Sequence, residues 1–128
     1  MIEYKNLNAS YLCSKFPELK DEINSENDYL GCNLPHSLYG NILNPLIIKL
    51  LNEDYYNKND LLYRIFNFYE DLAEYGDEET RNLLQVTLLE YLWDDYVIYN
   101  RSIAMMGEKT KIINKEIGQY IRIPVPKK

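Results

Sequence analysis

The sequence contains few of the residues on which small disulfide-linked proteins and most metal sites depend. Among 128 residues there are two cysteines, one histidine, five glycines and five prolines. Two irregularly placed cysteines cannot form a disulfide framework or a zinc cluster, so we expect Cys13 and Cys32 to be reduced thiols. A single imidazole, His36, argues against most zinc sites and facial-triad iron sites, which usually draw on more than one histidine. The low glycine and proline content argues against an all-β protein with many tight turns.

Long apolar runs are also absent. Residues 1–10 contain one lysine and no apolar core, so no secretory signal is expected. The longest apolar stretch, Leu46–Leu51, is interrupted by Lys49 and is far shorter than a membrane-spanning helix. We therefore expect a cytoplasmic protein that has no membrane partner.

What the sequence does contain is enough apolar material for a core and an excess of acidic side chains. Hydrophobic residues make up 46% of the chain and charged residues 27%, a composition that can offset the conformational entropy lost on folding. The length corresponds to one domain, residues 1–128. Twenty acidic residues against 14 basic ones give a net charge of -6. This charge argues against a nucleic-acid partner, because phosphates repel carboxylates, and it favours a basic protein partner.

Helical periodicity and capping signals are clearest in the second half of the chain. Apolar residues recur at helical spacing between Asn59 and Gly76, which predicts an amphipathic helix. Asp77 follows at once and is itself followed by acidic residues, the pattern of a second helix start. The short junction predicts an antiparallel hairpin. The second helix is expected to be buried on two faces, because it carries two apolar stripes: Leu84, Leu88, Tyr91 and Leu92, and Leu83, Val86, Leu89 and Trp93.

The remaining segments complete an all-α prediction. Later helices are expected over Tyr96–Met106 and from Glu108 to about Ile121, followed by an extended tail at residues 123–128, because Pro124 and Pro126 prevent a helix. The first half predicts helices over Leu7–Phe16 and Pro17–Ile23, a polar loop over Asn24–Asn33, and a helix from Pro35 that is interrupted at Asn44–Pro45 and restarts to Asn52. The expected fold is a single domain of six or seven helices, either a bundle or a short HEAT-like stack of antiparallel helix pairs.

Charge is segregated along the chain. Nine acidic residues and one basic residue lie between Glu70 and Asp95, whereas the segment from Tyr96 onward has two acidic and seven basic residues. Three interpretations stay open. In the first, Asp77, Glu78 and Glu79 cap a helix, and Glu70 and Glu74 form a solvated face that the basic C-terminal helix compensates. In the second the carboxylates hold two metal ions, and in the third they attract a basic partner. The metal interpretation would use Glu70, Glu74, Glu90 and Asp94, but the Glu-x-x-His pattern of such bundles is missing.

The partner-binding interpretation is the preferred one, and the abundance of tyrosine supports it. Thirteen tyrosines against three phenylalanines favour binding surfaces, although an AT-rich genome would also enrich tyrosine. Glu90 is expected beside Val86 at the edge of an apolar stripe and in line with Asp94, four residues later. There it either pairs with a cation of the C-terminal helix or anchors a cation of a partner. The candidate partner-binding residues are Tyr63, Glu70, Asp71, Glu74, Glu79, Glu90, Asp94 and Asp95.

A catalytic role has weak support in the sequence. Cys32 and His36 are four residues apart and form a conceivable nucleophile pair, but no oxyanion hole and no third orienting group can be identified. We therefore expect a protein that is not an enzyme, with no catalytic, cofactor-binding or metal-binding residues.

The stretch from about Leu38 to Gly118 carries a family resemblance. Its defining parts are LLYRIFNFYEDLAEYGDEETRNLLQVTLLEYLWDD and AMMGEKTKIINKEI. They resemble small acidic helical immunity proteins of bacterial polymorphic-toxin and contact-dependent growth inhibition systems. The resemblance implies an all-helical protein that binds and neutralises a cognate toxin, often a basic nuclease, by covering its active site or substrate groove. The alternative that the residues leave open is a non-enzymatic adaptor or regulatory module whose contact surface is the basic C-terminal helix.

Overall fold

Helices account for nearly all regular structure in the computed structural model, which describes residues 1–121. The predicted tail at residues 123–128 lies outside this range. Within it, strands are absent and a single β-bridge joins Ile2 to Gly76. The all-α prediction is confirmed, and the described residues contain seven α-helices: α1 (Ala9–Lys15), α2 (Lys20–Leu30), α3 (Pro35–Leu51), α4 (Asp60–Tyr75), α5 (Glu78–Leu83), α6 (Tyr96–Met105) and α7 (Glu108–Ile117).

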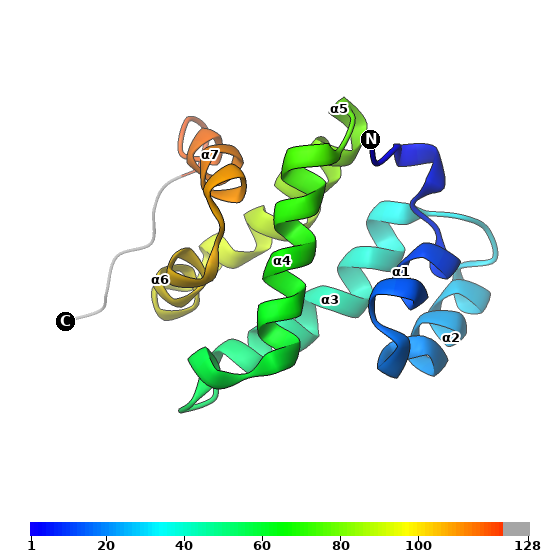
Figure 1. The fold of residues 1–128 in the computed structure, drawn as a ribbon, viewed down its shortest axis with the longest axis horizontal. Helices are drawn as coiled ribbons and strands as arrows, with labels where there is room; N and C mark the ends of the chain where they lie inside the picture. The colour runs from blue at the N-terminus through cyan, green and yellow to red at the C-terminus, as the bar shows by residue number, and fades with distance from the viewer. Residues whose placement is uncertain (122–128) are drawn as a thin grey trace.

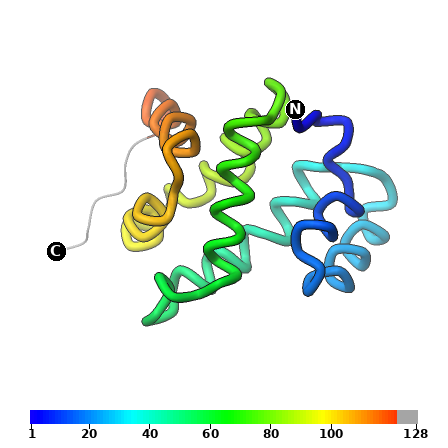
Figure 2. Tube along the Cα trace, viewed as in Figure 1, coloured from blue at the N-terminus to red at the C-terminus, as the bar shows by residue number. Residues whose placement is uncertain are grey.

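Helix α4 runs through the middle of the molecule (Figures 1 and 2). Helices α6 and α7 lie on one side of it and α1 and α2 on the other, while α3 passes behind it (Figure 1). Direct packing joins α4 to α7 and to α3, and α3 in turn contacts α2 and α6. The buried apolar side chains form one continuous core that draws on all of these helices.

The predicted junction between α4 and α5 is confirmed. Asn59 Oδ1 accepts a hydrogen bond from the Leu62 amide at the start of α4, and Asp77 Oδ1 accepts one from the Thr80 amide at the start of α5, both at 2.9 Å. Each carboxamide or carboxylate thus satisfies an amide that the first helical turn leaves unpaired. The chain reverses at Gly76, and α5 packs back against α4.

The helix that begins with α5 changes its winding. After Leu83 it continues as a π-helical segment, η4 (Leu84–Leu89), and then as a 3-10 segment, η5 (Glu90–Asp94). Its leucines are fully buried, as predicted. Val86 and Tyr91 are 42% and 45% exposed, so the prediction that both apolar stripes are buried is wrong at these two positions. A π turn is wider than an α turn, and it moves side chains away from the angles expected at 100° per residue.

The predicted polar loop at Asn24–Asn33 is wrong over most of its length. Helix α2 continues through these polar residues to Leu30 and ends where Gly31 adopts a left-handed conformation with φ 77°. Ile23 is buried and Leu30 is packed against the core, and α2 contacts both α1 and α3. Tertiary packing therefore extends a helix whose asparagines, serine and aspartate have low intrinsic helix propensity.

The predicted interruption at Asn44–Pro45 is also wrong, because α3 runs unbroken from Pro35 to Leu51 with Pro45 inside it. Leu43 and Ile47, on either side of the proline, are fully buried. The Asn44 side chain is fixed by a hydrogen bond from Nδ2 to the Thr87 carbonyl oxygen at 3.0 Å. These contacts hold the helix together despite the backbone hydrogen bond that a proline removes.

The end of α7 lies earlier than predicted. The helix ends at Ile117 and tight turns follow, in which the amides of Gly118 and Tyr120 donate to the carbonyl oxygens of Lys115 and Ile117. Gly118 contributes no side chain to extend the apolar face beyond Ile117, which is fully buried.

The N-terminal segment is bound to the α4–α5 junction. The Ile2 amide donates to the Tyr75 carbonyl oxygen at 2.6 Å, and the Asp77 amide donates to the Ile2 carbonyl oxygen at 2.9 Å. The Tyr4 amide donates to Asp77 Oδ2 at 3.1 Å. These bonds connect residues more than 70 positions apart. Asp77 thus caps α5 with one carboxylate oxygen and binds the N-terminal segment with the other.

Candidate functional site

Glu70, a predicted partner-binding residue, is engaged inside the molecule. It projects from α4 to the start of α7, where Oε2 accepts a hydrogen bond from the Lys109 amide at 3.0 Å. Its Oε1 accepts bonds from the Thr110 amide at 2.9 Å and from Thr110 Oγ1 at 2.8 Å. The carboxylate therefore caps α7, because Gly107, the residue at the N-cap position of this helix, has no side chain to do so.

The electrostatics of Glu70 follow from this position. Partial burial opposes its charge, but the hydrogen bonds from Thr110 and Lys109 outweigh that penalty and hold the pKa of the carboxyl group below its ordinary value. Gly107 is pressed against it, since a Cβ at that position would lie 2.5 Å from Glu70 Cδ. The residues Met106–Thr110, which belong to the segment AMMGEKTKIINKEI, thus lie where α7 packs on α4.

Two other acidic residues of the segment cap their own helices. Asp95, a predicted partner-binding residue, accepts a hydrogen bond from the Ile98 amide at 3.0 Å and begins α6. Asp77 begins α5, and its bonds from Thr80 and from the Tyr4 amide lower the pKa of its carboxyl group. The predicted helix-capping role of Asp77 is therefore confirmed, and Asp95 caps a helix as well. The prediction that Glu70 lies on a solvated face is wrong, because its carboxylate caps α7.

Glu90 and Asp94 lie together on the surface, as their predicted four-residue spacing requires. Tyr120 donates a hydrogen bond from its hydroxyl to Glu90 Oε2 at 3.1 Å, so within residues 1–121 a tyrosine occupies the place predicted for a cation. Asp94 is exposed. Both carboxylates line a shallow depression, which we call the carboxylate hollow, together with Val86, Thr87, Tyr91 and Ile121.

The other predicted residues are spread over the surface. Tyr63 is half exposed, Glu74 and Glu79 are exposed, and Asp71 is half-buried. The Asp71 carboxylate adds to the effect of burial in raising the pKa of Tyr11. Glu79 lines a depression between α5 and α7 that also contains Arg81, Lys109 and Glu116. The eight predicted residues therefore do not form one patch, and only Glu90 and Asp94 share a hollow.

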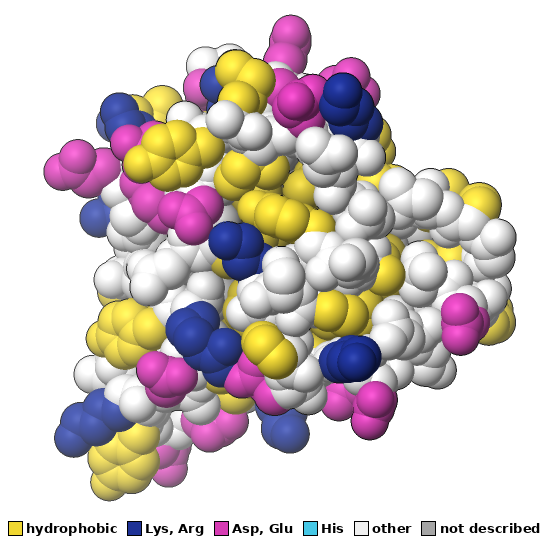
Figure 3. All heavy atoms as spheres, turned by 45° about the vertical axis from the view of Figure 1, so that its right-hand side comes forward, with side chains coloured by type: hydrophobic (Ala, Val, Ile, Leu, Met, Phe, Trp, Pro, Cys, Tyr) yellow, Lys and Arg dark blue, Asp and Glu magenta, His cyan; other side chains and the backbone are white. Residues whose placement is uncertain are grey.

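Charge compensation in the described part of the chain is indirect. Helix α7 packs on α4, as expected if the basic C-terminal helix compensates the acidic segment. Yet the ion pairs found among residues 1–121 are Lys5–Glu3, Arg64–Glu18 and Arg64–Asp60, and none of them includes a carboxylate between Glu70 and Asp95. On the face drawn in Figure 3, acidic and basic side chains are interspersed around hydrophobic ones. That face therefore carries charges of both signs.

A second depression adjoins the carboxylate hollow and was not predicted. We call it the amide hollow, and it lies between α3 and η4, lined by His36, Gly40, Asn41, Asn44, Pro45, Thr87 and Tyr91. Thr87 and Tyr91 belong to both hollows. The absence of a side chain at Gly40 lets η4 approach α3, because a Cβ there would lie 3.0 Å from Thr87 Cγ2.

Polar groups of α3 hold the π-helical segment at Thr87. His36 Nδ1 forms a hydrogen bond with Thr87 Oγ1, and Asn44 Nδ2 donates to the Thr87 carbonyl oxygen. Asn44 is 8% exposed, and its Oδ1 accepts no hydrogen bond from any residue between 1 and 121. The sequence did not predict the contacts of these residues with Thr87, because a projection at 100° per residue does not show a π turn. The spacing of Gly40 and Asn44, four residues apart in an apolar helix, is the signal that could have indicated them.

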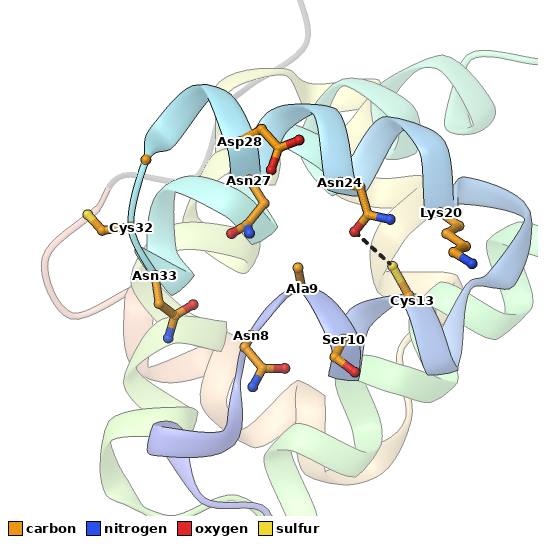
Figure 4. Close-up of a pocket in the computed structure, with 11 residues that line it drawn as sticks. Asn8, Ala9, Ser10, Cys13, Lys20, Asn24, Asn27, Asp28, Cys32 and Asn33 are labelled. Carbon is orange, nitrogen blue, oxygen red and sulfur yellow. Dashed lines mark hydrogen bonds between the residues drawn. The ribbon is translucent and has the colours of Figure 1, made fainter.

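The Cys32–His36 pair does not form a shared site. A depression between α1 and α2 includes both cysteines, and Figure 4 shows the Cys32 sulfur directed away from it. At the other end of this depression, Cys13 Sγ lies 3.9 Å from Asn24 Oδ1. His36 lines other depressions, next to Tyr4 and next to Thr87. The two side chains are therefore not aimed into a common pocket.

Residues 1–121 contain no group of three or more histidine, cysteine or acidic side chains placed to hold a metal ion. No helix within this range combines the length and apolar character needed to span a bilayer.

Fold and surface together define an all-helical domain with one core and open surface depressions among the described residues. The chain belongs to the DUF7674 family, described as a domain of unknown function, whose family model matches residues 9–122. No curated protein and no solved structure matches it.

Proposed function

We propose that this protein is a non-enzymatic immunity protein that binds a cognate bacterial toxin, a basic nuclease, and covers its active site or substrate groove. The observation that carries the proposal is the surface formed by η4 and η5. There the exposed apolar side chains of Val86 and Tyr91 lie beside the carboxylates of Glu90 and Asp94. Apolar anchors bordered by charges are typical of protein-binding surfaces.

The placement of the other carboxylates sharpens this proposal. Glu70 and Asp95 support helices α7 and α6, so a partner could recruit them only by breaking helix caps. Neither Glu90 nor Asp94 caps a helix within residues 1–121, and no ion pair in this range neutralises either carboxylate. Complementary charge accelerates association with a basic partner and makes its rate sensitive to salt.

The test is whether this protein neutralises the polypeptide that is encoded by the gene next to its own. Cells that produce that polypeptide are expected to die without this protein and to survive with it. Charge reversal at Glu90→Lys with Asp94→Lys should abolish protection and weaken binding measured by calorimetry at low ionic strength. Since the surface joins a basic partner, binding of the unmodified protein should weaken as salt is added.

The matched control reverses the same number of charges elsewhere. Glu53 and Asp54 are exposed in the turn after α3, and Glu53→Lys with Asp54→Lys changes the net charge equally. This variant should protect cells as the unmodified protein does. Loss of protection in both variants would show that protection depends on net charge and not on the surface at Glu90 and Asp94. If the neighbouring gene encodes a polypeptide that does not harm cells, the immunity proposal is overturned.

A second candidate function is an adaptor that contacts its partner through α7. One observation favours it: Ile112 is 57% exposed on this helix, among the exposed lysines Lys109, Lys111 and Lys115. An adaptor of this kind would bind an acidic partner. Ile112→Asp would then abolish binding, whereas the Glu90 and Asp94 reversals would leave it intact.

A further inference from the structure

The depression between α1 and α2 is lined by four asparagines, and we call it the asparagine groove (Figure 4). Its volume is about 720 Å³. Helix α2 contributes Asn24 and Asn27 to one wall, the start of α1 contributes Asn8 to the other, and Asn33 lies at one end (Figure 4). A ligand can reach all four side chains, because Asn27 is half-buried and the other three are exposed.

We propose that the asparagine groove binds an extended, uncharged polypeptide segment of another protein. A carboxamide carries an acceptor oxygen and two N–H donors, so it can pair with both the N–H and the C=O group of a peptide backbone. The inference goes beyond the immunity proposal and does not rest on it, because the groove shares no lining residue with the surface at Glu90 and Asp94.

The spacing of the asparagines on α2 matches an extended backbone. Asn24 and Asn27 are three residues apart on one helical face, so their Cβ atoms lie about 5–6 Å apart. In an extended chain, the backbone groups that face the same side recur at every second residue, or about every 6.6 Å. The two carboxamides can therefore pair with alternate residues of one segment. The wall from Lys20 to Gly31 is about 16 Å long, the length of about five extended residues.

Contacts inside the groove hold two of the asparagines in place. Asn8 Oδ1 accepts a hydrogen bond from the Tyr11 amide at 2.9 Å, and Asn24 Oδ1 lies 3.9 Å from Cys13 Sγ. Both contacts use the carboxamide oxygen, so the Nδ2 groups can donate to the carbonyl oxygens of a bound segment. Between the two walls, Ala9 presents only a methyl group (Figure 4). A peptide backbone can therefore come close to the floor of the groove.

The remaining lining disfavours other classes of ligand. Among residues 1–121, one cation, Lys20, and one anion, Asp28, line the groove. Their charges cancel, so the groove has no net charge with which to attract a phosphate group or a basic segment. No aromatic side chain in this part of the chain lines it, so the rings on which nucleobases stack are missing. Pairing with a peptide backbone requires neither net charge nor stacking.

The experiment titrates the isotopically labelled full chain with the pentapeptide acetyl-Ala-Ser-Ala-Ser-Ala-amide and follows the asparagine side-chain signals by NMR. The matched probe is the same peptide N-methylated at every residue, which keeps the side chains but has no N–H donors along its backbone. Binding of the first peptide in the millimolar range is expected. Shifts at Asn24, Asn27 and Asn33 with the first peptide, and not with the second, would support the proposal.

Variants test the carboxamides directly. Asn24→Leu with Asn27→Leu should weaken peptide binding by about tenfold, because two pairings with the backbone are lost. Leucine favours a helix more than asparagine does, so α2 should persist. The matched control is Asn67→Leu with Asn82→Leu, at two exposed positions outside the groove, and it should bind as the unmodified chain does. Equal shifts with the N-methylated peptide, no shift at the groove asparagines, or unchanged binding by the first variant would overturn the proposal.

The two cysteines of the chain provide an independent measurement. Both line the groove, but the Cys32 sulfur is directed away from it (Figure 4). With the peptide at ten times its dissociation constant, alkylation of Cys13 by iodoacetamide should slow by about tenfold, while alkylation of Cys32 should not change. Equal slowing at both cysteines would overturn the proposal. Binding that appears only after removal of residues 122–128 would also overturn it, because the occupant would then be the chain's own tail.

Discussion

Tyr69 lies at the centre of the core with its ring fully buried, and its hydroxyl has no hydrogen-bond partner among residues 1–121. Burial raises the pKa of this hydroxyl far above its ordinary value and keeps it neutral. An unpaired buried hydroxyl costs free energy that a hydrogen atom at the same place would not.

Tyr69→Phe should therefore retain the fold and raise the free energy of unfolding by about 1 kcal/mol. Urea unfolding measures this change, and the slope of free energy against urea should stay the same. A variant that is less stable than the unmodified protein would mean that the hydroxyl has a partner.

Glu70 gives a second prediction at the residue scale. Glu70→Gln keeps the shape of the side chain but removes the charge and replaces one acceptor oxygen with a donor group. It should lower the free energy of unfolding at neutral pH by about 1 kcal/mol, the usual value of a helix cap.

The pH dependence of stability separates the charge of Glu70 from its shape. Its pKa is lower in the folded protein than the ordinary value of 4.5, so its contribution is fully present above that value. The contribution is lost as the pH falls through the lower folded pKa. The stability difference between the unmodified protein and Glu70→Gln should therefore shrink on acidification through this range. A difference that is constant from neutral to acidic pH would contradict the role of the charge.

At the scale of elements, α3 carries a proline at a cost that its neighbours offset. Pro45 is exposed within a helix whose flanking residues are buried. Pro45→Ala restores an amide that can donate within the helix, and it should raise the free energy of unfolding by about 1 kcal/mol after the greater freedom of the unfolded chain is subtracted. Thermal unfolding checks this. A lower midpoint would show that the proline ring itself packs favourably.

Helix starts could be predicted from the sequence because they depend on one or two adjacent residues. Asn59, Asp77 and Asp95 cap the helices that follow them, and the local pattern alone indicates the first two. The continuation of α2 and α3 could not be predicted, because it depends on contacts with distant segments such as that between Asn44 and Thr87. The π turn of η4 escaped for the same reason.

The candidate site was harder to predict than the fold. The spacing of Glu90 and Asp94 correctly indicated a shared surface beside Val86. The distribution of acidic residues did not indicate that Glu70 points to α7, because the sequence does not say which helices are neighbours. The contacts of Asn44 and His36 with Thr87 could not be predicted, because they form only when η4 lies against α3.

At the scale of the whole molecule, the N-terminal segment connects distant parts of the chain. Removal of residues 1–4 deletes the backbone bonds to Tyr75 and Asp77. This deletion should lower the free energy of unfolding by about 2 kcal/mol, from two to three hydrogen bonds. Chemical denaturation measures it, and Ile2→Ala is the control that keeps the backbone bonds. Equal stability of the deletion variant and the unmodified protein would show that the segment is dispensable.

The π turn in η4 has a consequence for how this scaffold can diverge. A π turn holds one residue more than the α turn it replaces, and deletion of one residue between Leu84 and Leu89 would restore regular winding. Each residue of an α-helix advances by about 100°. Such a deletion would swing Glu90, Tyr91 and Asp94 about the helix axis together with the buried Leu92 and Trp93, while the leucines on the N-terminal side of the deletion stayed in register. The loss of a single codon would thus replace the exposed surface of this segment only together with a repacking of the core around Leu92 and Trp93.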